Sequence, residues 1–203
     1  MVPSLAVGGA TALAVTVLLA VATRAAAVQR LDDAVEAFAA SHRALASRFA
    51  RYGTLPGERW VHPAMGAATA LALWLARPAD GALRAIVPLA AASLGAIVAH
   101  HAIKLVYARP RPAGALARGK TEAAFPSGHT TDATAVVFTA AALLARAGLV
   151  PLALGLAVAG ALAAVTGVSR VALGWHWATD VLGGWLAGGA VAAGCLLLAS
   201  ALR

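Results

Sequence analysis

The stretch LVPLALGLAVAGALAAVTGV, residues 149–168, contains no charged side chain and is long enough to cross a lipid bilayer as one helix. The whole chain is similarly apolar: of its 203 residues, 61% are hydrophobic and 12% are charged. Soluble domains have about 45–50% apolar and about 25% charged residues. The sequence therefore predicts an all-α, polytopic membrane protein.

Five further apolar segments are separated by polar breaks, so we expect six transmembrane helices. The expected spans are about residues 5–23, 60–75, 82–107, 127–145, 149–168 and 177–202. The first span resembles a signal peptide in position, but its apolar core is long, no basic residue precedes it, and more spans follow. We therefore expect it to be retained, and the chain, residues 1–203, to form a single membrane-embedded domain.

Residues 31–52 differ from the spans, because apolar and charged residues are interleaved along them. Leu31, Phe38, Leu45 and Phe49 recur at roughly helical spacing among acidic and basic side chains. This pattern is typical of an amphipathic helix that lies at a membrane interface. An ordinary solvated helix would show it equally, so both interpretations stay open, and we expect an interfacial amphipathic helix after the first span.

The formal net charge of +8 indicates an anionic partner. The chain has no DNA-binding or RNA-binding pattern, so we expect no nucleic acid partner. In a membrane protein, positive charge more often meets lipid headgroups or an anionic substrate. The single cysteine, Cys195, excludes a disulfide framework within one chain and a cysteine-based metal site.

Three polar clusters lie at the ends of expected spans. In the first, Lys104 and Arg111 precede prolines that end the helix. Guanidinium groups bind phosphate as a bidentate fork and ammonium acts as a point charge, although cations at helix ends also serve as interfacial anchors. In the second, Ser127, Gly128 and His129 precede or begin a span, where free N–H groups favour an anion. A simple serine cap would have the same sequence.

The third cluster contains Arg170, His176 and Asp180. His176 and Asp180 are four residues apart, so on a helix they share a face and can hydrogen-bond. A carboxylate that holds one imidazole nitrogen leaves the other nitrogen free as a base or nucleophile. A pair that only locks two helices together is the alternative.

Taken together, the clusters resemble the three-part signature of the type 2 phosphatidic acid phosphatase superfamily, in its membrane lipid phosphate phosphatase branch. The matching patterns are K-x6-R-P at residues 104–112, P-S-G-H at residues 126–129, and S-R-x5-H-x3-D at residues 169–180. The resemblance implies that His176 is the nucleophile and forms a phosphohistidine, that Asp180 orients it, and that His129 protonates the leaving alkoxide and then activates water. The residues that would bind the phosphate oxygens are Lys104, Arg111, Ser127, Gly128 and Arg170.

The function implied is metal-independent hydrolysis of a phosphomonoester or diphosphate of a membrane lipid. The candidate substrates are phosphatidic acid, phosphatidylglycerol phosphate and polyprenyl diphosphate, and the sequence does not choose among them. We expect no cofactor and no metal, because side-chain cations would stabilise the transferred group. A phosphotransferase that uses an alcohol acceptor and a non-enzymatic membrane protein are the alternatives, and the complete motif set argues against the second. The oligomeric state cannot be read from the sequence.

The charge distribution and the family resemblance predict opposite orientations of the chain in the membrane. Six spans place all three motifs on the side opposite both termini. That side also carries more cations, because only four arginines lie on the other side: Arg77, Arg84, Arg146 and Arg203. The positive-inside rule would put the catalytic side in the cytoplasm, whereas the family resemblance implies the extracytoplasmic face. We follow the resemblance and expect a protein of the cell (inner) membrane with an extracytoplasmic active site.

Three further polar residues lie near the motifs in sequence. Asp132 follows His129 by about one turn and could support the site. His100 and His101 precede Lys104 by about one turn, and we expect them to be helix-packing residues.

Overall fold

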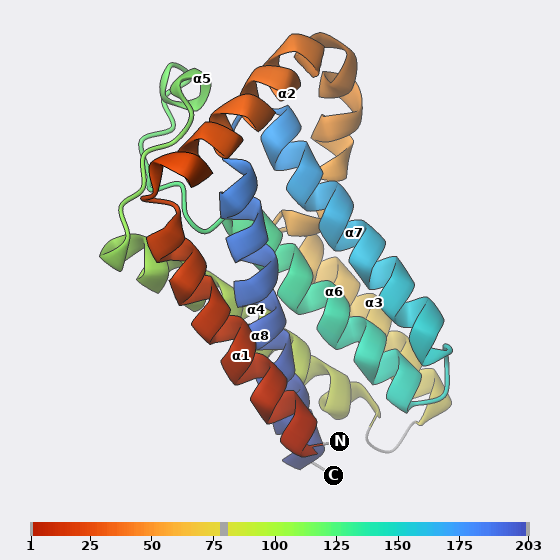
Figure 1. The fold of residues 1–203 in the computed structure, drawn as a ribbon. Coiled ribbons are helices and arrows are strands. Elements are labelled where there is room, and N and C mark those ends of the chain that lie inside the picture. The colour runs from red at the N-terminus through yellow and green to blue at the C-terminus, as the bar shows by residue number, and fades with distance from the viewer. Residues whose placement is uncertain (1, 78–80, 202–203) are drawn as a thin grey trace.

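The computed structural model describes residues 2–77 and 81–201, and within those ranges it is all-helical, as the sequence predicts. Its termini lie together at one end of the bundle, and α2 and α5 lie at the other (Figure 1). The elements are α1 (Val2–Ala22), α2 (Ala26–Gly53), the short 3-10 helix η1 (Leu55–Gly57), α3 (Val61–Ala76), α4 (Gly81–Val106), α5 (Ala113–Leu116), α6 (Gly128–Arg146), α7 (Leu152–Ala172) and α8 (Ala178–Ala201).

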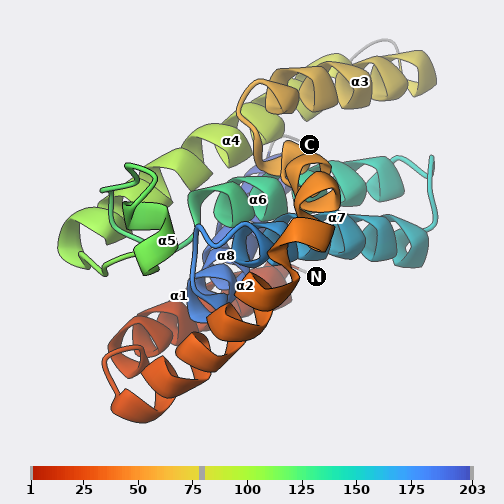
Figure 2. The same ribbon diagram turned by 90° about the horizontal axis from the view of Figure 1, so that it is seen from above.

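Helix α6 occupies the middle of the bundle and contacts α3, α4, α7 and α8 (Figure 2). Glycines allow α8 to approach it closely. A Cβ added to Gly188 would lie 2.5 Å from the carbonyl oxygen of Thr131, and one added to Gly184 would lie 2.8 Å from Thr130 Cβ. Small residues at helix contacts serve the same purpose in membrane bundles generally. This packing fixes the N-terminal end of α6, where the second motif lies.

In the described part of the chain, four helices are long and apolar enough to span a membrane: Pro3–Ala22, Ala85–Val106, Leu152–Ala172 and Ala178–Ala201. They agree with four of the six expected spans, although Leu202 at the end of the last one lies outside the described residues. The other two expected spans correspond to α3, which is apolar but shorter, and to α6. Helix α6 is largely enclosed by its neighbours and carries several buried threonines, so it needs no uniformly apolar surface. The total of six spans stays a prediction.

Helix α2 is longer than residues 31–52 and lies over the end of the bundle that holds α5 (Figure 1). Its apolar residues Leu31, Phe38, Leu45 and Phe49 are exposed, whereas Asp32 is fully buried. The helix therefore turns an apolar stripe away from the protein, and its position at a membrane interface stays a prediction.

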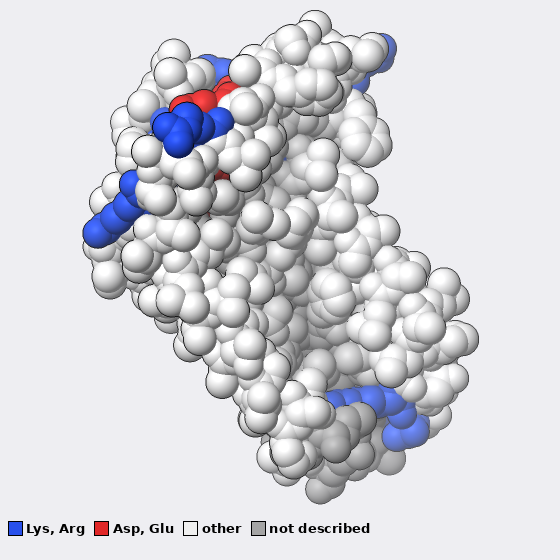
Figure 3. Space-filling model, viewed as in Figure 1, with Lys and Arg blue, Asp and Glu red and all other residues white. Residues whose placement is uncertain are grey.

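Charged side chains are distributed in two zones on the face shown in Figure 3. Lys and Arg gather toward the two ends of the molecule, Asp and Glu are visible only toward the upper end, and the broad middle zone shows no charge. With the apolar helices, this distribution is that of an integral membrane protein.

Candidate active site

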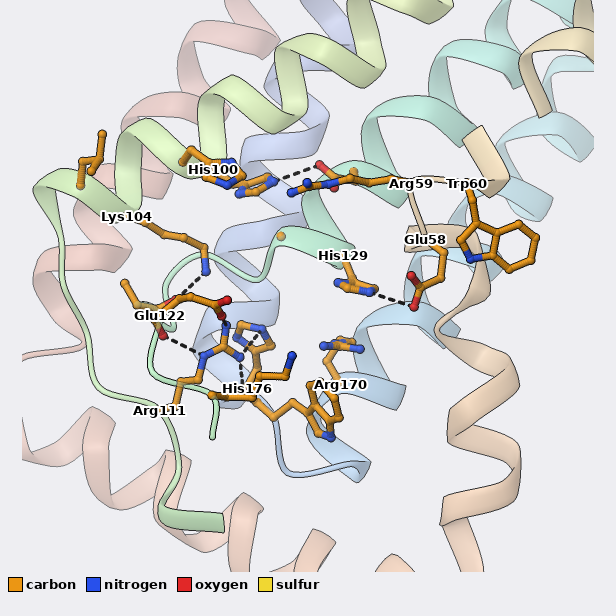
Figure 4. A pocket seen from close by; sticks show the side chains of 18 residues that line it. Glu58, Arg59, Trp60, His100, Lys104, Arg111, Glu122, His129, Arg170 and His176 are labelled. Carbon is orange, nitrogen blue, oxygen red and sulfur yellow. Dashed lines mark hydrogen bonds and ion pairs between the residues drawn. The ribbon is translucent and has the colours of Figure 1, made fainter. Parts of the chain in front are cut away.

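The three motif clusters meet in one pocket of about 740 Å³ (Figure 4). Its walls come from the turn after η1, the C-terminal end of α4, the connection that includes Arg111 and Glu122, the N-terminal turn of α6, and the junction between α7 and α8. Residues that lie more than 70 positions apart in sequence, such as Lys104 and His176, therefore face the same space. The convergence agrees with the sequence-based expectation of one site.

Most of the predicted site residues line this pocket: Lys104, Arg111, Gly128, His129, Arg170 and His176. Ser127 and Asp180 lie behind its wall and are fully buried. The Ser127 hydroxyl accepts a hydrogen bond from Thr130 Oγ1 at 2.9 Å, and the Ser127 N–H donates to the carbonyl of Asp180 at 2.9 Å. In this geometry Ser127 fixes the start of α6 and does not present its hydroxyl to the pocket.

His176 is buried between a cation and a carboxylate. Its Nε2 lies 3.1 Å from Arg111 Nη1, and its Nδ1 lies 3.4 Å from Asp180 Oδ2. The expectation that both residues share a helix face is wrong in detail, because α8 begins only at Ala178. Asp180 lies in the first turn of α8, where its Oδ2 accepts the N–H of Trp177 at 2.9 Å, and His176 reaches the carboxylate from the preceding turn.

The surroundings of His176 disfavour its protonated form. Burial in the protein interior, followed by the positive charges of Arg111, Arg170 and Lys104, holds the pKa of His176 well below its usual range. The imidazole is therefore neutral near pH 7, and Nε2, whose neighbour Arg111 can only donate, carries a lone pair on the pocket side.

Arg109 connects Asp180 to α2. Its Nη1 donates to Asp180 Oδ1 at 2.8 Å and its Nη2 to Asp32 Oδ2 at 2.7 Å, and all three side chains are almost completely buried. Asp32 Oδ1 also accepts the backbone N–H of Thr179 at 3.0 Å. The carboxylate beside His176 is thus held by a network that the sequence-based set of site residues did not include.

The three cations among the phosphate-binding candidates have protein partners in the pocket. Lys104 Nζ donates to the carbonyl of Ala123. Arg111 donates from Nε to the carbonyl of Glu122 at 2.8 Å and lies 3.3 Å from the Glu122 carboxylate. Arg170 donates to Thr54 Oγ1 at 2.9 Å, and its guanidinium carbon lies 4.8 Å from the centroid of the Trp175 ring. These contacts orient three cations toward one region.

His129 faces a carboxylate from the turn after η1. Its Nε2 lies 3.1 Å from Glu58 Oε1, and both side chains are about one-third exposed to the pocket. Gly57 allows this turn to approach α6, because an added Cβ there would lie 2.5 Å from the carbonyl oxygen of His129. Glu58 is another residue that sequence reasoning missed. A single acidic residue in a polar turn gives no spacing signal that could have identified it.

Within residues 2–77 and 81–201, no group of three or more His, Cys, Asp or Glu side chains could hold a metal ion. The expectation of metal-independent chemistry stays a prediction, which rests on the cations that line the pocket.

Comparisons with known proteins agree with this geometry. The family model described as the PAP2 superfamily matches residues 85–203. The chain is similar in fold to the first transmembrane PAP2 type phosphatidylglycerolphosphate phosphatase from Bacillus subtilis, with a TM-score of 0.76 and 23% identity over 96% of this chain and 97% of that one. No curated protein matches the chain. The chain belongs to the PAP2 superfamily and is a phosphoric ester hydrolase.

Proposed function

We propose that this protein is a metal-independent phosphatase that removes phosphate from a membrane lipid through a phosphohistidine on His176. The observation that carries the proposal is the position of His176 Nε2, which lies on the wall of a pocket that also contains Lys104, Arg111 and Arg170. A neutral imidazole nitrogen among fixed cations is suited to attack a phosphorus atom whose oxygens those cations neutralise.

Substrate binding would replace protein acceptors with phosphate oxygens. Arg111 now contacts the carboxylate of Glu122, which is an exposed side chain, and Lys104 contacts the carbonyl of Ala123. A phosphate group carries more negative charge than either partner and can accept from both cations at once. The backbone N–H of Gly128, at the N-terminal turn of α6, adds a donor at the positive end of the helix dipole.

In the first chemical step, Arg111 Nη1 turns from His176 Nε2 to a phosphate oxygen and frees the imidazole lone pair. Nε2 then forms a bond to phosphorus, and the bond from phosphorus to the lipid oxygen breaks. A phosphate dianion bound next to His129 favours the protonated imidazole, which donates its proton to the departing alkoxide while Glu58 holds the ring. Asp180 stabilises the positive charge that develops on His176. In the second step, His129 takes a proton from water as its oxygen attacks phosphorus, the P–N bond breaks, and inorganic phosphate leaves.

A lipid substrate is supported by the surface around the pocket. Trp60 and Leu105 line the pocket at the ends of α3 and α4, and they are 68% and 86% exposed. An exposed aromatic and an exposed aliphatic side chain beside apolar helices suit contact with lipid at the membrane interface. A headgroup could therefore enter while its hydrocarbon tail stays in the bilayer. We place this chemistry on the extracytoplasmic face of the cell (inner) membrane.

The proposal is tested with purified protein in detergent, in the presence of EDTA, on a panel of lipid phosphates. We expect phosphate release that EDTA does not reduce. Brief incubation with ³²P-labelled substrate and an alkaline quench should trap a phosphoprotein that is labile to acid, as a phosphohistidine is. His176→Ala should lose both the labelled protein and turnover, and His42→Ala, an exposed histidine on α2, should lose neither. Retention of more than a few per cent of activity by His176→Ala would contradict the proposal.

A further inference from the structure

A histidine and an aspartate form a second polar pair in the same pocket, next to the cations that would bind the phosphate. His100 on α4 is 3% exposed and Asp132 on α6 is 2% exposed, and both line the pocket. His100 Nε2 lies 3.4 Å from Asp132 Oδ1. Neither atom makes a hydrogen bond within the described part of the chain, and the same is true of His100 Nδ1. Figure 4 shows His100 beyond Lys104, on the side of the pocket away from His176.

Buried polar atoms without partners are costly, especially among membrane-spanning helices. A pair that only joined α4 to α6 would be expected to make short, well-directed hydrogen bonds, because each broken one destabilises the fold. Here three polar atoms are left without such bonds, at the wall of a pocket that accepts a substrate. This arrangement is more characteristic of a binding site whose ligand completes the hydrogen bonds.

The pair is adjacent to the phosphate region. His100 precedes Lys104 by one helical turn on α4, and Asp132 follows Gly128 by one turn on α6. The edge of the His100 ring faces Gly128, because a Cβ added there would lie 3.2 Å from Cε1 and 3.4 Å from each ring nitrogen. A group bound by His100 and Asp132 would therefore be attached within a few bonds of a phosphate held by Lys104 and Gly128.

The chemistry of the pair selects a hydrogen-bond donor. A carboxylate only accepts hydrogen bonds, and a neutral imidazole has one donor and one acceptor nitrogen. When the donor nitrogen of His100 faces Asp132, the other nitrogen and the carboxylate oxygens all remain acceptors. A hydroxyl group can donate its one hydrogen to one of these acceptors. An ester carbonyl, a phosphate oxygen or a prenyl chain cannot, because none of these groups carries a hydrogen to donate. No hydrogen bond to the described protein fixes the ring or Oδ1, so a small side-chain rotation suffices for contact.

We propose that His100 and Asp132 form a hydroxyl-binding subsite, and that the preferred substrate is a lipid phosphate with a free hydroxyl on the carbon next to the phosphoester carbon. Glycerol-phosphate headgroups and monoacyl glycerol phosphates have this feature. Phosphatidic acid, in which both other hydroxyls are esterified, and polyprenyl phosphates or diphosphates do not. The inference rests on the proposed function, because it assumes that a lipid phosphate occupies the cationic part of the pocket.

The test uses two substrates that differ only in that hydroxyl: 1-oleoyl glycerol 3-phosphate and its 2-deoxy analogue, in the same detergent micelles. The wild-type protein should hydrolyse the hydroxyl-bearing lipid with a kcat/KM roughly 10- to 100-fold higher, the range expected for one hydrogen bond to a charged or buried acceptor. His100→Leu and Asp132→Asn should each reduce that ratio to less than about threefold. His42→Leu, an exposed histidine on α2 that does not line the pocket, should leave it unchanged.

The substrate ratio separates this inference from a purely structural role, since loss of folded protein lowers both rates and leaves their ratio intact. Equal kcat/KM values for the two lipids in the wild type would overturn the subsite while leaving the phosphatase function standing. An unchanged ratio in either variant would also overturn it. If one variant cannot be purified, the substrate ratios of the wild type and of the other variant still test the hydroxyl-binding subsite. Absence of phosphate release from every lipid would instead refute the proposed function, and the subsite with it.

Discussion

Arg109 Nη1 lies 2.8 Å from Asp180 Oδ1, while the other oxygen of the same carboxylate faces His176. The guanidinium thereby fixes the rotation of the carboxylate that positions the nucleophile. The same guanidinium also binds Asp32, so a single fork holds two carboxylates from different helices. The geometry of His176 therefore depends on a residue that does not line the pocket.

Replacing Arg109 should impair catalysis without removing any pocket-lining group. We expect Arg109→Gln to lower kcat by about 10- to 100-fold and to destabilise the protein by about 3–5 kcal/mol, because two buried carboxylates lose their cation. Arg109→Lys should recover only part of either loss, since a point charge cannot replace the fork. Steady-state kinetics and thermal unfolding in detergent measure the two effects. Arg48→Gln, an exposed arginine on α2, is the control. Normal kcat in Arg109→Gln would show that Asp180 needs no such support.

Glu58 should matter most when the leaving group is a poor one. If Glu58 keeps a proton on His129, Glu58→Gln should lower kcat for an alkyl phosphate by roughly 10- to 100-fold, within the usual contribution of general acid catalysis. An aryl phosphate such as p-nitrophenyl phosphate needs less protonation, so its kcat for phosphoryl transfer to His176 should fall much less. Asp33→Asn, an exposed acid on α2, should change neither rate. Equal losses with both substrates would argue that Glu58 acts on folding or binding and not on the proton.

Stability should decrease in mild acid because of His176. Burial and nearby cations hold its pKa well below the usual value, whereas in the unfolded chain it is about 6.5. Below pH 6.5 the unfolded state binds a proton that the folded state does not, so stability falls as the pH is lowered. Between pH 7.5 and 5, the melting temperature of the wild type should therefore fall more than that of His176→Gln. A smaller or equal fall in the wild type would mean that the folded protein accepts the proton.

Accessibility of single cysteines decides the membrane orientation. In a Cys195→Ala background, Ala117→Cys lies on the side of the active site, and Leu149→Cys lies in the connection between α6 and α7 at the other end of α6. Both native residues are exposed. We expect a membrane-impermeant thiol reagent to label position 117 in intact cells, and to label position 149 only after permeabilisation. The reverse pattern would favour the positive-inside count and put hydrolysis in the cytoplasm.

The sequence predicted the fold class and the convergence of the three motifs for physical reasons that act locally. Long uncharged runs have few structural outcomes other than membrane helices. The motif residues lie at helix ends, such as Lys104 on α4 and His129 on α6, and the structure brings these ends together at one level of the bundle. Spacing alone was less reliable at His176 and Asp180, where the start of the helix fell between the two residues.

The missed residues belong to contacts between distant segments. Asp32 lies among other charged residues on an amphipathic pattern, so the sequence gives no reason to separate it from the solvated Asp33 beside it. Only the packing of α2 against the start of α8 shows that Asp32 is buried and paired with Arg109. His100 was assigned to helix packing for a similar reason, because its partner, Asp132, lies on another helix.

The network around Arg109 also sets the smallest piece of this chain that can be an enzyme. The family match begins at residue 85, yet three residues before it complete the site: Asp32 binds Arg109, Thr54 binds Arg170, and Glu58 binds His129. A fragment that starts at residue 85 would leave a buried guanidinium with only one of its two carboxylates. Domain grafts, split-protein pairs and chimaeras with other members of the superfamily therefore need a boundary ahead of α2, so that the helix and the residues it brings to the pocket move together.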